Sequence, residues 1–231
     1  TIRYPGRVIR FPLRTALLVA AAFLAIVAVA LVAYRWVDPP ATPLMLIRLA
    51  EGEGLSYRPR PLAAIAPTLA RSVIASEDNR FCLHAGVDWG AVGDALDELD
   101  NGRRLRGAST ITMQVARNLF LWPGGGFVRK AAEVPLALAI DFLWPKRRII
   151  EVYLEIAEWG HGIYGAEAAA EAHFGKPAAR LSGHEAALLA AVLPNPRRWD
   201  AARPTAYIER RAAIIEARTR QLGGLLGCLS A

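Results

Sequence analysis

One long apolar run stands out near the start of the chain. Residues Thr15 to Tyr34 carry no charge and are mainly Ala, Leu, Val and Ile, and roughly 20 such residues span the hydrocarbon core of a bilayer. The pattern predicts a transmembrane helix over residues 15–36, with Trp36 where aromatic side chains favour the interface. A cleaved signal peptide is the alternative, but its apolar region is usually about 7–15 residues long. We therefore favour a membrane anchor.

The remaining chain has the apolar spacing of helices, without clear strand alternation or an internal repeat. One helix begins at Pro67 and places Glu77 near its end. Further helices are predicted over residues 109–121, 128–144, 146–157, 166–174, 182–192 and 207–222. Pro135 should kink or restart the helix over residues 128–144 close to Glu133, because proline cannot donate a backbone hydrogen bond. These elements predict a mainly α-helical domain over residues 61–231, joined to the anchor by a linker over residues 37–60.

Charge sets the expected orientation of this anchor. Four arginines precede the apolar run without an acidic residue: Arg3, Arg7, Arg10 and Arg14. The positive-inside rule then keeps residues 1–14 in the cytoplasm and places everything after Asp38 across the membrane. The net charge of +7 leaves 7 − 4 = +3 for the rest of the chain. That mild excess suits a membrane surface or a phosphate-bearing substrate, and it does not indicate a nucleic-acid-binding protein.

Cysteine and histidine residues give little sign of a cross-linked or metal-binding protein. Cys82 and Cys228 are the two cysteines, and in an oxidising compartment they could pair. Two cysteines do not make a disulfide framework, however, and their sequence separation says nothing about geometry, so we expect them to be unpaired and partly buried. No zinc-ligand spacing occurs among the four histidines, for which we expect structural roles: His84, His161, His173 and His184. A Ser-x-x-Lys motif is also missing, which argues against an attached transpeptidase.

Two polar islands between the apolar helices have the composition of an active site. Glu77 and Asp78 stand at a helix end, where an apolar environment can suit a carboxyl group to proton transfer. A surface carboxylate pair that caps the next turn is an equally simple explanation. Residues Gly107 to Thr110 offer backbone N–H groups and two hydroxyls at a helix start, a cradle for an anion or a sugar. An ordinary Ser/Thr N-cap explains them as well.

Cationic residues form a third group. Arg117, Arg129 and Lys130 carry donors suited to phosphate oxygens. Glu133 lies four residues after Arg129, so an i,i+4 ion pair is its simplest explanation.

Taken together, the islands resemble the peptidoglycan glycosyltransferases of family 51 in their monofunctional, biosynthetic form. The resemblance runs from about Pro59 to Gly224. Four motifs carry it: Glu77-Asp78-x-x-Phe81-x-x-His84-x-Gly86, Gly107-x-Ser109-Thr110-Ile111-x-x-Gln114-x-x-Arg117-Asn118-Leu119, Arg129-Lys130-x-x-Glu133 and Lys146-x-x-Ile149-Ile150-Glu151-x-Tyr153-Leu154. Each fragment is weak alone, whereas all of them in this order are specific.

The resemblance implies a lysozyme-like fold that polymerises lipid II on the outer face of the inner membrane. Glu77 would be the general base, and Glu133 would be a second acid that orients cations or a divalent ion. Substrate-binding roles are implied for Asp78, Phe81, His84, Ser109, Thr110, Gln114, Arg117, Asn118, Arg129 and Lys130. The expected partners are lipid II, the nascent glycan strand, the membrane and other cell-wall synthesis proteins. A divalent cation, Mg²⁺ or Mn²⁺, is left open as a cofactor.

Several positions depart from the family pattern. Arg117 stands where lysine is usual, Met113 replaces a glutamine, and Glu155 replaces an asparagine.

Two other functions also fit the motifs, a glycan-cleaving hydrolase or lytic transglycosylase and a non-catalytic cell-wall scaffold. Apolar residues around the glycine-rich break form either a flap that dips into the membrane or a core-helix end with a loop: Phe120, Leu121, Trp122, Phe127 and Val128.

Overall fold

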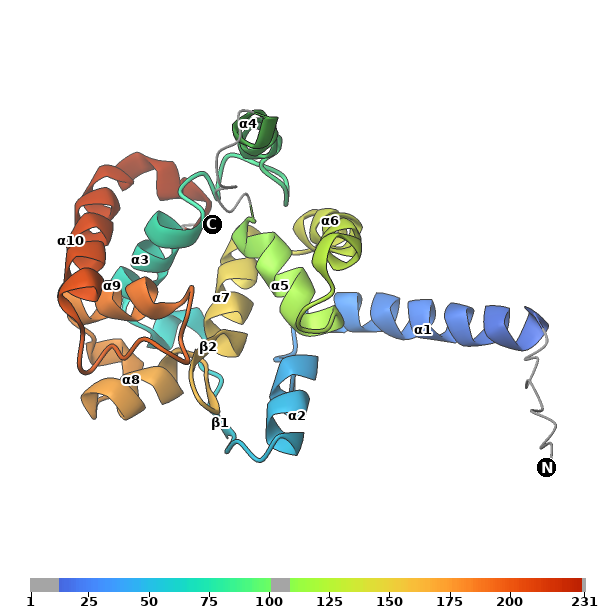
Figure 1. Ribbon diagram of the computed structural model, residues 1–231, viewed down its shortest axis with the longest axis horizontal. Helices are drawn as coiled ribbons and strands as arrows, with labels where there is room; N and C mark the ends of the chain where they lie inside the picture. The colour runs from blue at the N-terminus through green and yellow to red at the C-terminus, as the bar shows by residue number, and fades with distance from the viewer. Residues whose placement is uncertain (1–12, 101–108, 230–231) are drawn as a thin grey trace, which may run out of the picture.

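The computed structural model describes residues 13–100 and 109–229, and most of these residues are helical (Figure 1). The α-helices are α1 (Leu13–Ala33), α2 (Pro43–Ala50), α3 (Pro67–Glu77), α4 (Trp89–Asp100), α5 (Ile111–Phe120), α6 (Gly126–Leu143), α7 (Lys146–Ile156), α8 (Ala166–Phe174), α9 (Gly183–Val192) and α10 (Ala206–Gln221). Short 3₁₀ segments cover Leu62–Ala64, Ala178–Arg180 and Gly223–Leu229. The predicted mainly α-helical class is therefore confirmed.

Helix α1 projects from one end of the molecule, and α10 lies at the opposite end (Figure 1). Residues Arg14 to Ala33 are long and apolar enough to cross a membrane, and only 6% of the most apolar window in this segment is buried. An apolar helix with so little protein contact is compatible with the predicted anchor. Most of the basic N-terminus that we predicted lies outside the described residues.

The periodic helices agree closely with their predicted ranges, but two helices and a small sheet were not predicted. Helix α2 and strand β1 (Ser56–Tyr57) fall in the expected linker, and α4 follows the loop after Glu77. Strand β1 pairs in parallel with β3 (Ile163–Tyr164), which pairs antiparallel with β2 (Glu158–Gly160). Strands of two or three residues are too short to show the alternation by which strands are recognised.

Helix α6 runs through Pro135 as one element, so the restart that we gave as one of two possible effects of this proline does not occur. Glu133 and the apolar residues that follow therefore share one continuous helix. Helix α7 packs against α5, α6 and α8, while α9 lies between α3 and α10. The core between them contains fully buried aromatic side chains, including Trp159, whose Nε1 donates to the Leu189 carbonyl at 3.1 Å.

A cluster of hydrogen bonds joins the end of α1 to the rest of the domain. Arg148 on α7 donates to the carbonyls of Tyr34 and Val37 at 3.0 and 2.9 Å, and its guanidinium lies 3.0 Å from the Asp38 carboxylate. Trp144 Nε1 donates to the Leu31 carbonyl at 2.7 Å. Because both side chains bind the end of α1 and the residues just after it, they fix the position of the domain relative to α1.

Glu155 is a buried acid close to Asp38 and Arg148 of this cluster. Only 1% of the residue is exposed, and neither carboxylate oxygen has a hydrogen-bond partner within residues 13–100 and 109–229. Burial, reinforced by the nearby Asp38 carboxylate, raises the pKa of Glu155 to about 8, although Arg148 Nη1 lies 3.9 Å from Oε1 and opposes the shift. The acid is therefore protonated in the folded protein at neutral pH.

This buried acid predicts a pH-dependent stability. The unfolded chain loses the proton near pH 4.5 and the folded chain near pH 8, so the folded state binds more protons between these values. The free energy of unfolding should then fall as pH rises through this window, by at most about 1.4 kcal/mol per pH unit. In thermal unfolding, the Tm of Glu155→Gln should equal that of the wild type near pH 5 and should be higher than that of the wild type near pH 8. An equal difference at both pH values would contradict the assignment.

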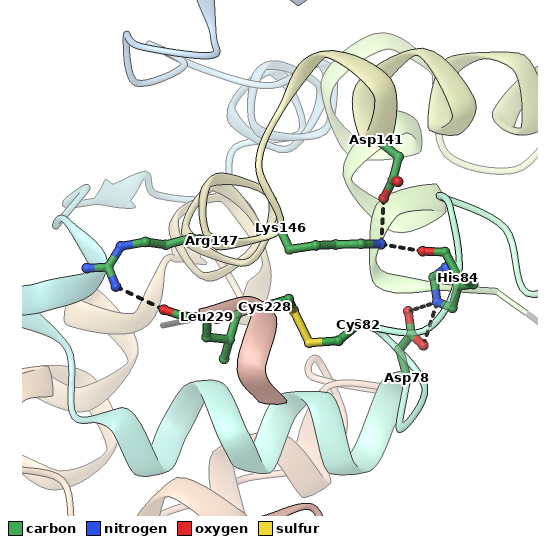
Figure 2. Close-up of a disulfide and its surroundings, with 8 residues drawn as sticks. All are labelled: Asp78, Cys82, His84, Asp141, Lys146, Arg147, Cys228 and Leu229. Carbon is green, nitrogen blue, oxygen red and sulfur yellow. Dashed lines mark hydrogen bonds and ion pairs between the residues drawn. A yellow bond between two sulfur atoms is a disulfide. The ribbon is translucent and has the colours of Figure 1, made fainter. Parts of the chain in front are cut away.

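The two cysteines form a disulfide, so our expectation of unpaired thiols was wrong (Figure 2). Their Cα atoms are 5.6 Å apart although 146 positions separate them in sequence. The 3₁₀ segment after α10 brings Cys228 back to the loop that follows α3, where Cys82 lies. Arg147 Nη1 donates to the Leu229 carbonyl at 3.2 Å in the same region. Sequence separation could not show this return of the chain.

Candidate active site

Glu77 is the last residue of α3 and lines a cleft of about 350 Å³. Its Oε2 accepts a hydrogen bond from Gln114 Nε2 at 3.1 Å, and its Oε1 accepts from Ser76 Oγ at 3.2 Å. Both donors are neutral, so they hold the carboxylate without pairing its charge. Glu77 at the end of α3 and Gln114 on α5 both lie on the predicted helices, and the fold brings their side chains together.

A buried tyrosine orients this glutamine. Tyr153 on α7 donates from its hydroxyl to Gln114 Oε1 at 3.2 Å. Burial raises the pKa of Tyr153 well above its usual value, and the nearby Glu77 carboxylate adds to the shift. Because the hydroxyl keeps its proton and donates, the glutamine amide must turn its NH₂ toward Glu77. Sequence reasoning missed this role of Tyr153.

The other residues of the first motif hold the scaffold around Glu77. Asp78 Oδ2 accepts from the backbone N–H of Ile111 at 2.9 Å, and His84 Nε2 lies 3.0 Å from Asp78 Oδ1 (Figure 2). Phe81 is fully buried, and Lys146 Nζ lies 4.7 Å from its ring centroid. Asp78 also lines the cleft, whereas Phe81 has no exposed surface for a substrate. The structure gives Phe81 a packing role in place of the expected substrate contact.

Lys146 completes this scaffold from the start of α7. Its Nζ donates to the His84 carbonyl at 2.7 Å and lies 2.5 Å from the Asp141 carboxylate (Figure 2). The loop that carries His84 is therefore bound to α6 and α7. Gly86 lets the same loop approach α6, because its φ is +78° and a Cβ there would lie 2.6 Å from the Ala137 carbonyl oxygen.

The hydroxyl pair at the start of α5 lies on the rim of the cleft. Thr110 is an N-cap: its Oγ1 accepts from the Met113 N–H at 3.1 Å and donates to the Gly86 carbonyl at 2.6 Å. Ser109 accepts a hydrogen bond from Lys130 Nζ. The capping role that we left open for Thr110 is thus present, while Ser109 connects the cleft to a cation. The Gly107–Ala108 part of the predicted cradle lies outside the described residues.

Glu133 is buried on α6 between two cations. Only 1% of the residue is exposed; its Oε1 forms the expected ion pair with Arg129, and its Oε2 lies 3.3 Å from Lys130 Nζ. A buried carboxylate held by two cations is a positioning group, since both of its oxygens are occupied. It orients Arg129 and Lys130 as a pair.

A second cleft of about 260 Å³ lies beside these cations. Arg117, Asn118 and Arg129 line it, and Arg117 Nε donates to Asn118 Oδ1 at 3.4 Å. Arg48 from α2 also lines this cleft, and Arg218 from α10 lines the cleft of Glu77. Neither residue was predicted, because Arg48 lies in the expected linker and Arg218 in a helix without a recognised motif.

The described residues do not fit a divalent cation held by the protein alone. Within them, no group of three His, Cys, Asp or Glu side chains could hold an ion. Glu133, the acid that we had connected with a metal, has both oxygens on cationic side chains. We derive no step through a metal ion.

Comparison with known proteins identifies the family to which the chain belongs. Residues 48–220 match the sequence profile of the family described as transglycosylase. The chain belongs to the transglycosylase family. It is 59% identical to a biosynthetic peptidoglycan transglycosylase of Rhodospirillum centenum over 94% of each chain. A protein of the same name from Caulobacter vibrioides is 46% identical over 97% of this chain and 100% of its own length.

Membership of this family confirms the resemblance inferred from the motifs. The protein is a transglycosylase and hence an enzyme, which argues against the non-catalytic scaffold. The matched segment begins at Arg48 in α2 and ends at Arg220 in α10. It thus includes part of the expected linker, and with it the arginine that lines the second cleft.

Proposed function

We propose that this transglycosylase polymerises lipid II into glycan strands on the outer face of the inner membrane, with its N-terminus in the cytoplasm. The observation that carries the proposal is one carboxylate, Glu77, held by neutral donors in a cleft beside an ordered set of cations. The carboxylate suits proton abstraction, and the cations suit a pyrophosphate. A glycan-cleaving hydrolase releases no pyrophosphate, so these cations would have no anionic leaving group to stabilise.

Glu77 acts as the general base in this proposal. It takes the proton from the 4-hydroxyl of the acceptor sugar while that oxygen attacks the anomeric carbon of the lipid-linked donor. The new glycosidic bond forms as the bond to the polyprenyl pyrophosphate breaks, and the anomeric centre inverts. Gln114 and Ser76 hold the carboxylate in place for this transfer. The hydroxyl of Ser109, on the rim of the same cleft, is placed to position a sugar.

Negative charge builds on the pyrophosphate as it leaves. Arg117 and Arg129 line the second cleft. Lys130 is next to Arg129 in sequence and donates a hydrogen bond to Ser109, which lines the cleft of Glu77. Fixed donors aimed at developing charge stabilise the transition state without a reorganisation cost. Glu133 contributes by holding Arg129 and Lys130 in one geometry.

The second cleft lies next to the membrane end of the domain, which suits a lipid-linked pyrophosphate. Phe120, at the end of α5, stacks on Tyr34 just after α1, with ring centroids 6.4 Å apart. Nearby apolar side chains are exposed: Trp122 by 51% and Val128 by 73%. These residues support the predicted flap at the membrane surface, although the side chain of Phe127 lies outside what the structure describes. The polyprenyl tail would then remain in the bilayer.

Removing Arg129 should slow turnover more than it destabilises the fold. We expect Arg129→Ala to lower kcat/KM for lipid II by about 10²-fold, because one charged donor to the leaving pyrophosphate is lost. Lys130 still pairs with Glu133 in this variant, so the buried acid retains a cation. Steady-state polymerisation and thermal unfolding measured on the same preparation test this. A collapse in Tm with little loss of turnover would show that the ion pair is the main role.

A lipid II polymerisation assay tests the proposed function. The full-length protein in neutral detergent should convert lipid II into glycan strands and release polyprenyl pyrophosphate. Parallel reactions with chelator and with added Mg²⁺ or Mn²⁺ show whether turnover depends on a divalent ion. Release of sugars from preformed strands, without elongation of lipid II, would support the hydrolase and overturn the proposal.

A further inference from the structure

A third hollow adjoins the cleft of Glu77 and lies along α10. Its volume is about 330 Å³, and three arginines and three apolar or aromatic side chains line it together with Ser76: Tyr207, Arg210, Arg211, Ile214, Ile215 and Arg218. Ser76 and Arg218 also line the cleft of Glu77. Because the two hollows share these residues, they adjoin. We call the hollow on α10 the arginine groove.

The arginine groove carries positive charge that the described protein does not neutralise. Glu209 and Glu216 are the acids of α10 closest in sequence to these arginines, and both contact His184 on α9. Glu209 Oε2 lies 3.5 Å from His184 Nε2, and Glu216 Oε1 lies 2.8 Å from His184 Nδ1. Arg210 and Arg218 are exposed and form no ion pair with any residue that the structure describes. An anionic ligand would therefore meet free guanidinium groups there.

Exposed carbon surface accompanies these charges. Tyr207 is 51% exposed and Ile214 is 53% exposed, and the Tyr207 ring lies 5.6 Å from that of Trp199. A site that combines guanidinium groups with an exposed aromatic ring suits a ligand with carboxylates and apolar faces, such as a glycan that carries peptides. Guanidinium groups can bind carboxylates through two parallel hydrogen bonds.

The position of the groove argues against a lipid headgroup as its ligand. Helix α10 lies at the end of the molecule opposite to α1 (Figure 1). A domain held by α1 therefore keeps this groove away from the bilayer surface. A polymer that extends beyond the cleft of Glu77 on the side of Ser76 and Arg218 would, in contrast, enter the groove, because the two hollows adjoin there.

We propose that the arginine groove binds the carboxylate-bearing peptide side chains of the glycan strand, beyond the sugars that react. This inference rests on the proposed function, because it requires a strand in the cleft of Glu77. The groove holds the strand between successive additions, and its loss allows earlier release. Strand length is then set partly by charge on α10, and it decreases at high salt because exposed charges are screened.

Charge reversal at Arg210 tests the proposal. Arg210 lines the groove and not the cleft of Glu77, and Arg220→Glu is the matched control because Arg220 is exposed on the same helix but lines neither hollow. Binding of soluble glycan strands with free carboxylates to the full-length protein should weaken about tenfold in Arg210→Glu and remain unchanged in Arg220→Glu. Amidation of those carboxylates should weaken binding to the wild type by a similar factor, and it should not weaken binding to Arg210→Glu to the same extent, because that variant has lost the attraction at position 210.

Product length provides a second readout. The strands made from lipid II should be shorter with Arg210→Glu than with the wild type or Arg220→Glu, in neutral detergent and in vesicles alike. A length change that occurs only in phosphatidylglycerol vesicles would show a headgroup site and overturn the proposal. Equal strand binding by all three proteins would also overturn it. If the wild type does not elongate lipid II at all, the proposed function fails, whereas normal elongation with no effect of Arg210 rejects the groove alone.

Discussion

Glu77→Gln is expected to abolish polymerisation of lipid II while the protein stays folded. General base catalysis typically contributes about 10²–10⁴-fold to a rate, so kcat should fall by on the order of 10³-fold or more. Glutamine has the size of glutamate and can still accept the hydrogen bond from Gln114 Nε2 through its own carbonyl. It cannot take a proton from the sugar hydroxyl. The loss should therefore appear in turnover, while Tm stays close to that of the wild type.

A matched variant separates this effect from a general change of charge. Glu171 on α8 is an acid whose side chain is 40% exposed, paired with Arg58 on the surface, and it lines none of the clefts described above. Glu171→Gln should polymerise lipid II at the wild-type rate. Full activity of Glu77→Gln under the same conditions would remove Glu77 as the base, since no basic atom would remain at that position.

The fold could be predicted where the chain repeats a helical pattern, and it could not where the pattern is short. Residues 166–174 were predicted and found as α8, and the capping box of Ser182 and Glu185 is present at the start of α9. Helix α2 has eight residues, too few for a clear periodicity, and its N-cap Thr42 pairs with Met45, an unusual partner. Helix α4 contains Gly90 and Gly93, which lower helical propensity.

The site could be predicted as a set of chemical groups but not as a geometry. Glu77 and the cations followed from residue type and order in the chain. The orientation of Gln114 by Tyr153 depends on side chains 39 positions apart, which only the packing of α5 against α7 brings together. The scaffold role of Phe81 likewise reflects burial, which a motif does not reveal.

Loss of the disulfide should cause a large fall in the free energy of unfolding. Cys82→Ser or Cys228→Ser opens a cross-link between residues 146 positions apart. A loop of that length corresponds to up to about 5 kcal/mol in the free energy of unfolding on the chain-entropy estimate, and about 2–4 kcal/mol is typical. The two single variants and the double variant should lose the same amount, because each removes the same bond. Thermal unfolding with and without reductant measures it.

The disulfide also connects stability to the orientation proposed for the membrane anchor. Such bonds persist outside the cytoplasm and are reduced within it, so protein isolated from the membrane should contain no free thiol. The wild-type domain produced in a reducing cytoplasm should have the same low Tm as Cys82→Ser. Oxidation should then raise the Tm of the wild type and leave that of Cys82→Ser unchanged. Activity should fall with stability, because Cys82 lies in the loop between Asp78 and His84 that binds the start of α5. Free thiols in membrane-derived protein would contradict the bond, and a wild-type Tm equal to that of Cys82→Ser would contradict its expected role in stability.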